Sequence, residues 1–182
     1  MKEKALLRKR MLRIRREAHK QFSEQGKSAI QQAIHTLSFE KENVIAGYWP
    51  MRSELDPIPA METLAHQGYT LCLPIVEEDG APLSFKLWSP GQSLISGVYG
   101  TQIPPSHSPK CIPDVLLVPL VAFHRSGYRL GYGGGFYDRT LATLRQTQAT
   151  LAIGLAYSAQ EVQELPIDSF DQKLDGIITE KE

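Results

Sequence analysis

The chain has 182 residues, 42% of them hydrophobic, which is enough to close one substantial core. Its 20 Lys and Arg residues balance 20 Asp and Glu residues, so the overall charge favours neither a nucleic acid nor a membrane surface as partner. We therefore predict one domain over residues 1–182 that acts as a monomer on small molecules, without a nucleic acid or membrane partner.

Cysteine usage and targeting signals point to the cell interior. Cys72 and Cys111 lie in apolar contexts without further cysteines at metal-ligand spacing, so we expect buried, reduced thiols. The basic N-terminus is not followed by the apolar core of about 7 to 15 residues that a signal peptide needs. No apolar run approaches the length of a membrane span. These features predict a cytoplasmic protein.

Residues 4–20 are predicted to form a helix with one apolar face. Its apolar positions recur at spacings of four, three and four residues: Leu7, Met11, Ile14 and Ala18. On a helical wheel, Lys4, Arg8 and Arg15 fall together along one border of this stripe. Residues 1–20 hold nine basic and two acidic residues, so this helix carries a local positive charge that the whole chain lacks.

The rest of the chain alternates between predicted strands and helices. A second helix is expected from Ser23, as its N-cap, to about Leu37, and a third over residues 57–66 with Gly68 as its stop. Strands are expected at residues 44–48, 70–73 (closed by Pro74), 83–87, 115–120, 151–155 and 176–179. Residues 89–112, rich in Gly, Pro and Ser, are expected to form an irregular connection.

This alternation predicts an α/β fold. We expect a single-domain, mostly parallel twisted sheet with helices on both faces, a Rossmann-like three-layer sandwich. Ligands of such sheets bind outside the carboxyl ends of the strands.

A glycine-rich segment lies at such an end. Four of five consecutive positions are glycine, between the apolar run 115–123 and a predicted helix at 136–145: Gly131, Gly133, Gly134 and Gly135. Glycine allows positive φ and a close approach of backbone N–H groups to a ligand, and the N-terminus of the next helix adds roughly +0.5 of dipole charge. With Arg129, Asp138 and Arg139 around it, the segment is predicted to bind a phosphate.

The two best-known phosphate loops do not fit this segment. A Walker loop would need a Lys-Ser/Thr pair after the glycines, and Phe136 occupies the position of the third glycine of a dinucleotide fingerprint. A tight glycine turn that merely lets a strand and a helix pack is the alternative explanation.

The segment from Gly127 to Arg139, with Pro119 to Phe123 before it, resembles the nucleotide-binding signature of the 5-formyltetrahydrofolate cyclo-ligases, also called methenyltetrahydrofolate synthetases. The similarity extends to the Lys4-x-x-x-Arg8 pair and to residues 48–56, 68–74 and 166–179. The resemblance implies an ATP- and Mg²⁺-dependent enzyme that irreversibly closes 5-formyltetrahydrofolate to 5,10-methenyltetrahydrofolate, releasing ADP and phosphate.

The resemblance also implies roles for individual residues. ATP contacts are implied at Lys4, Arg8, Arg129, Gly131, Gly133, Gly134, Gly135, Phe136 and Tyr137. Folate contacts are implied at Arg8, Trp49, Met51, Glu54, Tyr132, Gly133, Gly134, Gly135 and Phe136. Arg129 and Tyr137 would be catalytic, and Asp138 and Asp171 would bind Mg²⁺, with Asp175 a weaker candidate.

Simpler explanations and other functions remain open from the residues alone. The basic residues could form a solvated face, Glu54 could be a surface loop acid, and Asp138 could be a favourable charge at a helix start. The competing functions are an RNA-binding module that uses the basic helix, and a sugar-phosphate isomerase or acyl-group transferase built on the same sheet.

Overall fold

A computed structural model describes residues 2–37 and 39–181, so residues 1, 38 and 182 of the predicted domain lie outside the described part. The helices are α1 (Lys2–Thr36), α2 (Ile58–His66) and α3 (Phe136–Thr147), with the 3₁₀ turns η1 (Val98–Gly100) and η2 (Ser158–Gln160). The strands are β1 (Val44–Ala46), β2 (Thr70–Ile75), β3 (Ser84–Leu87), β4 (Ile95–Ser96), β5 (Gln102–Ile103), β6 (Lys110–Cys111), β7 (Val115–Pro119), β8 (Ala122–Phe123), β9 (Arg129–Leu130), β10 (Leu151–Leu155) and β11 (Gly176–Ile178).

The main sheet has seven strands in the order β11-β10-β7-β1-β2-β3-β6. The five strands from β11 to β2 are parallel, and at the other edge β3 pairs antiparallel with both β2 and β6. Ile45 of β1 pairs with Leu71 of β2 on one side and with Val115 of β7 on the other. The predicted α/β fold with a mostly parallel sheet is therefore confirmed.

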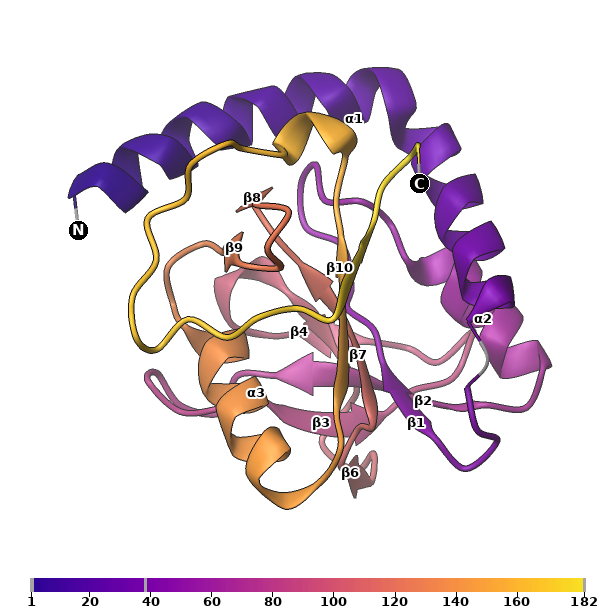
Figure 1. Cartoon of the computed structure of the whole chain (residues 1–182). Helices are drawn as coiled ribbons and strands as arrows, with labels where there is room; N and C mark the ends of the chain where they lie inside the picture. Colours follow the sequence, from indigo (N-terminus) through magenta and orange to yellow (C-terminus); the bar gives the residue numbers. More distant parts are fainter. Residues whose placement is uncertain (1, 38, 182) are drawn as a thin grey trace.

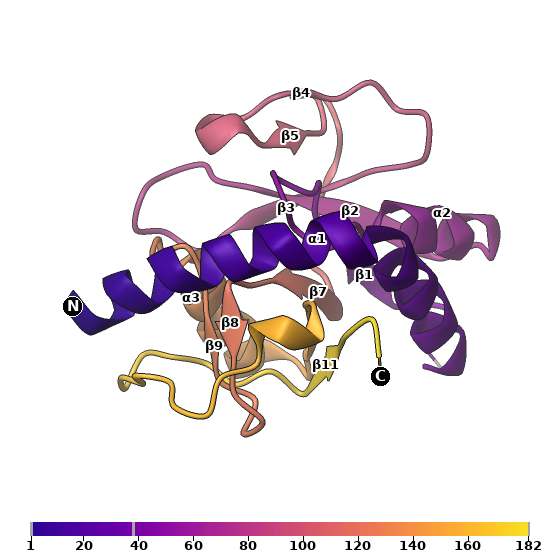
Figure 2. The same ribbon diagram turned by 90° about the horizontal axis from the view of Figure 1, so that it is seen from above.

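Helices cover both faces of the sheet, as Figures 1 and 2 show. Leu117 of β7 packs in one buried cluster with Ile30 of α1 and Leu64 of α2. Leu116, the residue before it, packs in another cluster with Leu141 of α3. Alternate residues of a strand point to opposite faces, so an apolar strand such as β7 is buried on both sides, and each buried Leu side chain stabilises by about 1.5–3 kcal/mol.

The two predicted N-terminal helices are one helix of 35 residues, so the prediction of an N-cap at Ser23 is wrong. Buried residues on both sides of Ser23, among them Ala18 and Ile30, belong to the same core cluster. Gly26 lets the helix pack closely against Leu55, because a Cβ there would come within 2.2 Å of Leu55 Cδ1. Tertiary packing of a continuous apolar face thus outweighs the capping preference of one serine. In Figure 1 the helix arches over the sheet and turns down one side.

Helices α2 and α3 and strand β10 lie where the sequence predicts them, but three other parts of the chain differ from the prediction. Strand β2 continues through Pro74, because β1 pairs only as far as Cys72 and Pro74 faces Phe85 of the antiparallel β3. The segment 89–112, predicted to be irregular, contains β4, η1, β5 and β6. Strands β8 and β9 form a further, unpredicted hairpin between β7 and the glycine-rich segment.

No helix in the described ranges is long and apolar enough to cross a membrane.

Candidate functional site

A cavity of about 1180 Å³ opens where the carboxyl ends of β1 and β7 meet the N-terminal half of α1. Residues of the loop 49–54, the segment 131–135 and the segment 168–172 also line it. In Figure 2 the β4–β5 hairpin stands apart from the main sheet. The residues that were predicted to bind ATP, folate or Mg²⁺ line this one cavity, with the exception of the weaker metal candidate Asp175. The Asp175 carboxylate instead accepts hydrogen bonds from Arg145 and from the N–H of Ala152. The volume of the cavity exceeds the roughly 300–1,000 Å³ of a typical ligand pocket, as two substrates bound side by side would require.

The segment 131–135, called the glycine loop below, joins β9 to α3 in a conformation that needs glycine. Gly133 has φ 109° and Gly135 has φ 67°, which side chains rarely adopt. A Cβ on Gly134 would lie 2.6 Å from the Phe136 ring. Gly135 is also the N-cap of α3, so the first free N–H groups of that helix lie beside the cavity. This geometry suits an anion at the loop.

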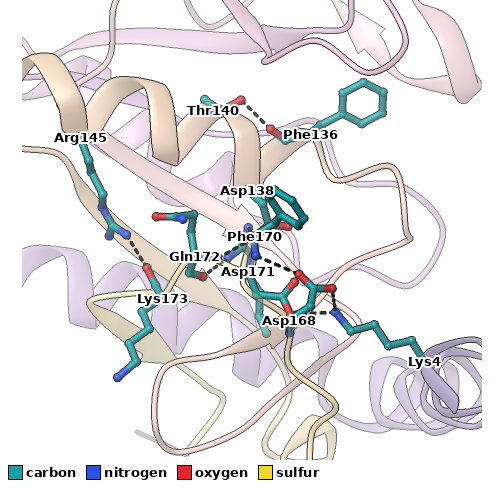
Figure 3. Close-up of polar contacts among 11 residues, drawn as sticks. Lys4, Phe136, Asp138, Thr140, Arg145, Asp168, Phe170, Asp171, Gln172 and Lys173 are labelled. Atoms are coloured by element: carbon teal, nitrogen blue, oxygen red, sulfur yellow. Dashed lines mark hydrogen bonds and ion pairs between the residues drawn. The ribbon is translucent and has the colours of Figure 1, made fainter. Parts of the chain in front are cut away.

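Lys4 and Arg8 reach the cavity from consecutive turns of α1. Arg8 Nε donates to the carbonyl oxygen of Gly131 at 2.8 Å. Lys4 Nζ lies 2.8 Å from Asp168 Oδ2 and 2.7 Å from Asp171 Oδ2, as Figure 3 shows. Burial lowers the pKa of Lys4, but hydrogen bonds to the two aspartates outweigh it and raise the pKa above its usual value. The helix therefore presents two cations to the cavity, both already in contact with the loops of its wall.

Arg129 is a largely buried residue of the cavity lining and forms an ion pair with Asp138. Its side chain is 3% exposed, and its Nη2 lies 3.0 Å from Asp138 Oδ1. The same carboxylate oxygen accepts the N–H of Gln172 at 2.9 Å, while Arg129 Nη1 donates to the Gln172 carbonyl at 2.6 Å. Burial lowers the pKa of Arg129, and Asp138 opposes that shift. Asp138 is thus more than a helix-start charge, because it fixes the 168–172 segment against α3.

The two predicted magnesium ligands lie on the same wall of the cavity. Within residues 2–37 and 39–181, no group of three or more His, Cys, Asp or Glu side chains is placed to hold a metal ion. The contacts described above occupy Oδ1 of Asp138 and Oδ2 of Asp171, which leaves the second oxygen of each carboxylate for another ligand. Magnesium commonly takes only one or two protein carboxylates, with phosphate and water oxygens in the other positions, so this pair of side chains fits Mg²⁺.

Glu54 is a buried residue of the cavity wall. It is 3% exposed, so the alternative of a surface loop acid is wrong. Its Oε2 accepts the N–H of Met51 at 2.8 Å, but Oε1 has no hydrogen-bond partner among the described residues. Burial raises the pKa of Glu54, and the Met51 hydrogen bond and the Arg15 charge oppose that shift. A buried carboxylate oxygen without a donor is costly, and in a cavity it marks a position for a donor on a ligand.

Arg15 is the neighbour of Glu54 that the sequence analysis did not assign. Its side chain is 1% exposed, and its Nη1 lies 3.8 Å from Glu54 Oε1. The helical wheel already grouped Arg15 with Lys4 and Arg8, and this was the only available signal that it points inward. Other basic residues of this helix, such as Arg13 and Arg16, are exposed.

Aromatic side chains form much of the remaining wall. Trp49 lies on the Glu54 side, and Phe136 lies 6.2 Å, ring centre to ring centre, from Tyr99 of η1, which the sequence analysis missed. Burial, and next the nearby Glu54 charge, raise the pKa of Tyr137, so its phenol keeps its proton at neutral pH and can donate a hydrogen bond. Flat aromatic walls with a few polar groups suit a flat heterocyclic ligand.

Comparisons with known proteins agree on one family. A sequence model of the 5-formyltetrahydrofolate cyclo-ligase family matches residues 1–180. The chain is 33% identical over 176 residues to the 5-formyltetrahydrofolate cyclo-ligase of Escherichia coli (strain K12), which covers 93% of this chain and 96% of that protein. It is 31% identical over 191 residues to the 5-formyltetrahydrofolate cyclo-ligase of Mycolicibacterium smegmatis, covering 99% and 95% of the two chains.

Solved structures show the same fold. The NMR structure of 5,10-methenyltetrahydrofolate synthetase from Aquifex aeolicus has a TM-score of 0.77 and 32% identity, over 98% of this chain and 90% of that chain. The 5,10-methenyltetrahydrofolate synthetase of Mycoplasma pneumoniae has a TM-score of 0.69 and 27% identity, over 97% and 98%. These similarities extend over nearly the full length of both chains in each pair.

Proposed function

Because the chain belongs to the 5-formyltetrahydrofolate cyclo-ligase family, we propose that it is a ligase that uses ATP and Mg²⁺ to convert 5-formyltetrahydrofolate to 5,10-methenyltetrahydrofolate. The family membership confirms the resemblance seen in the sequence. One observation of the structure supports the proposal most strongly: a single cavity is lined by a glycine loop with two nearby cations and by a buried carboxylate that has one unpaired oxygen.

The chemistry explains why such a reaction needs ATP. A formamide carbonyl is a poor electrophile, and its oxygen is a poor leaving group. When the formyl oxygen takes the γ-phosphoryl group, ADP leaves, and the carbon becomes open to attack by nitrogen 10 of the same folate. Ring closure then expels the oxygen as inorganic phosphate, and nitrogen 10 loses its proton. Both steps depend on alignment and on neutralising negative charge, which a rigid cavity can supply.

In this proposal the nucleotide lies against the glycine loop and α1. Backbone N–H groups of Gly133 to Gly135 and the N-terminus of α3 would bind phosphate oxygens, and Lys4 and Arg8 would neutralise them from above. Arg129 would stabilise this region through its ion pair, and the Tyr137 phenol would donate to the group in transfer.

Magnesium, when bound between the nucleotide phosphates and the protein, would stabilise the negative charge that develops during phosphoryl transfer. Asp138 and Asp171 would hold it through the carboxylate oxygens that the neighbouring side chains leave open.

The folate would lie at the Glu54 end of the cavity. A pterin ring carries adjacent N–H and amino donors, and the open Oε1 of Glu54 is an acceptor for them. Trp49, Met51 and Tyr132 would cover the ring, with Phe136 and Arg8 at the border with the nucleotide. This order places the formyl group between the two halves of the cavity.

The direct test is to incubate the purified protein with 5-formyltetrahydrofolate, ATP and Mg²⁺ and to follow the near-ultraviolet absorbance of the methenyl product. Product should form at a rate proportional to enzyme and should release one ADP for each methenyl group. Reactions without ATP, or with a chelator in excess of Mg²⁺, should stay at background. A folded preparation that makes no product under any of these conditions would refute the proposal.

Replacing Asp138 with Asn should raise the Mg²⁺ concentration needed for half-maximal turnover by about tenfold or more, because a neutral amide binds a hard cation poorly. It should also lower the melting temperature, since Arg129 would lose its carboxylate partner. Magnesium titrations well below the melting temperature separate the two effects. Asp168→Asn is the matched control, since Asp168 lies in the same cavity and pairs with Lys4 but is not a proposed ligand. If the Asp138→Asn and wild-type titrations superimpose, Asp138 serves only to hold Arg129.

A further inference from the structure

We propose that Arg15 is a positioning residue for folate recognition: from the buried side of α1 it keeps the Glu54 carboxylate charged and facing the cavity, and it holds Tyr132 of the glycine loop beside it. The inference rests on the proposed function, because it concerns the folate end of the same cavity. It is separate from phosphate binding, which that proposal assigns to Lys4 and Arg8.

The guanidinium of Arg15 joins three segments that are far apart in the sequence. Its Nη1 donates to the Leu120 carbonyl at 3.1 Å, just beyond β7, and its Nε donates to Ser53 Oγ at 3.3 Å, in the loop that carries Glu54. Its Nη2 donates to the Tyr132 hydroxyl, and the Tyr132 ring centre lies 5.3 Å from the guanidinium carbon. A planar group with a fixed fork of donors thereby sets the relative position of the Glu54 loop and the glycine loop.

The contacts of Arg15 leave Glu54 open to a ligand. All three hydrogen bonds of the guanidinium go to neutral oxygens, while Glu54 Oε1 lies 3.8 Å from Nη1, beyond hydrogen-bond reach. A pair that served stability alone would be expected to close into a direct, charge-assisted hydrogen bond, because a buried ion pair with an unfilled acceptor is costly. Here the charge is compensated, and Oε1 makes no hydrogen bond of good geometry, although the Tyr132 hydroxyl lies near enough to the carboxylate to lower its pKa. A ligand with N–H donors can therefore bind this oxygen.

The surroundings of Glu54 decide its protonation. The charged and titratable groups that face it come from every element packed around it: Arg15 from α1, Tyr48 just beyond β1, Arg52 from its own loop, Tyr132 from the glycine loop and Tyr137 from α3. Burial raises the pKa of Glu54. The Met51 N–H, then the Arg15 charge, the Tyr132 hydroxyl and the Arg52 charge lower it, in that order. Arg52 is exposed, so solvent screens its charge, and Arg15 is the buried cation of the set.

Loss of the Arg15 charge should therefore change how folate binding depends on pH. Without the Arg15 charge, less remains to counter the effect of burial, and the pKa of Glu54 rises further. The carboxylate is charged above its pKa and protonated below it. As the solution is made more acidic, folate affinity should therefore begin to fall at a higher pH in an Arg15→Gln variant than in the wild type.

The experiment compares Arg15→Gln with Arg16→Gln, the exposed neighbour on the same helix, by calorimetric titration of 5-formyltetrahydrofolate and, separately, of ATP over mildly acidic to mildly alkaline pH. Arg15→Gln should lower folate affinity at neutral pH about tenfold or more, because the Glu54 loop and Tyr132 lose the charge-assisted donor that positions them, and it should move the midpoint of the pH dependence upward. Its ATP affinity should stay at the wild-type value. Arg16→Gln should match the wild type for both ligands.

Two outcomes would overturn the inference: an unmoved pH midpoint, or equal losses of ATP and folate affinity. If Arg15→Gln does not fold, Arg15→Lys carries the test, because lysine keeps the charge but loses the fork. Arg15→Lys should weaken folate binding with the pH midpoint unchanged, and either unaltered folate affinity or a shifted midpoint would count against the role. Failure of the wild type to bind the folate at all would instead refute the proposed function.

Discussion

Glu54→Ala should weaken binding of 5-formyltetrahydrofolate by roughly tenfold to 150-fold while leaving ATP affinity nearly unchanged. The reason is that the open Oε1 of Glu54 is the proposed acceptor for the pterin donors, and a charge-assisted hydrogen bond contributes about 1.5–3 kcal/mol. A difference of 1.4 kcal/mol is about a factor of ten in affinity. Calorimetric titration of each ligand separately into wild type and variant measures both quantities.

Glu54→Gln separates recognition from packing, because it keeps the shape of the side chain and one acceptor but removes the charge. Its folate affinity should lie between those of the wild type and Glu54→Ala. Glu62→Ala, at an exposed position on α2, is the matched control and should change neither affinity. If ATP affinity falls as much as folate affinity, or if folate affinity does not change, Glu54 is structural and the folate lies elsewhere.

Arg8→Ala should lower kcat/KM by about a hundredfold or more, the scale found when one donor to a charge that develops in the transition state is removed. Arg8 uses Nε to bind the Gly131 carbonyl, so the remaining donors of its guanidinium stay available to a phosphate. The variant should unfold at the same temperature as the wild type, because Arg8 is only half-buried and alanine favours a helix. Steady-state kinetics with ATP varied, together with thermal unfolding, provide the two measurements.

Arg13→Ala is the control for charge alone, since Arg13 lies on the same helix with its side chain exposed. It should leave kcat/KM for ATP unchanged, whereas Lys4→Ala should reduce it. Equal losses at all three positions would mean that α1 attracts the nucleotide only through its diffuse positive charge.

Sequence patterns predicted the parts of the fold that depend on local order. The start of α3 followed from the glycine loop, the bounds of β10 from a short apolar run, and the layered architecture from the alternation of strands and helices. The missed elements depend on distant partners. The strands of the β4–β5 hairpin have two residues each, and α1 is continuous because its apolar face packs against the sheet on both sides of Ser23.

The candidate site shows the same division. Motif resemblance named the candidate residues, and the structure brings the predicted ATP and folate contacts to one cavity. The resemblance could not show which of these residues contact each other. Arg129 and Asp138 are nine positions apart and form an ion pair only because the β8–β9 hairpin and α3 fold against each other. Arg15 looked like one more cation on a basic helix, since burial of a charged side chain depends on partners that the local sequence does not contain.

The contact between Lys4 and its two aspartates has a consequence for how substrates enter. A metal ion on the open oxygen of Asp171 would lie close to the ammonium group that neutralises this carboxylate, and the two positive charges would repel each other. A nucleotide that arrives with its metal ion already attached would bring phosphate oxygens to pair with Lys4 as the metal ion binds. In the proposed reaction, entry of the complete metal–nucleotide complex would therefore be favoured over stepwise loading of either component.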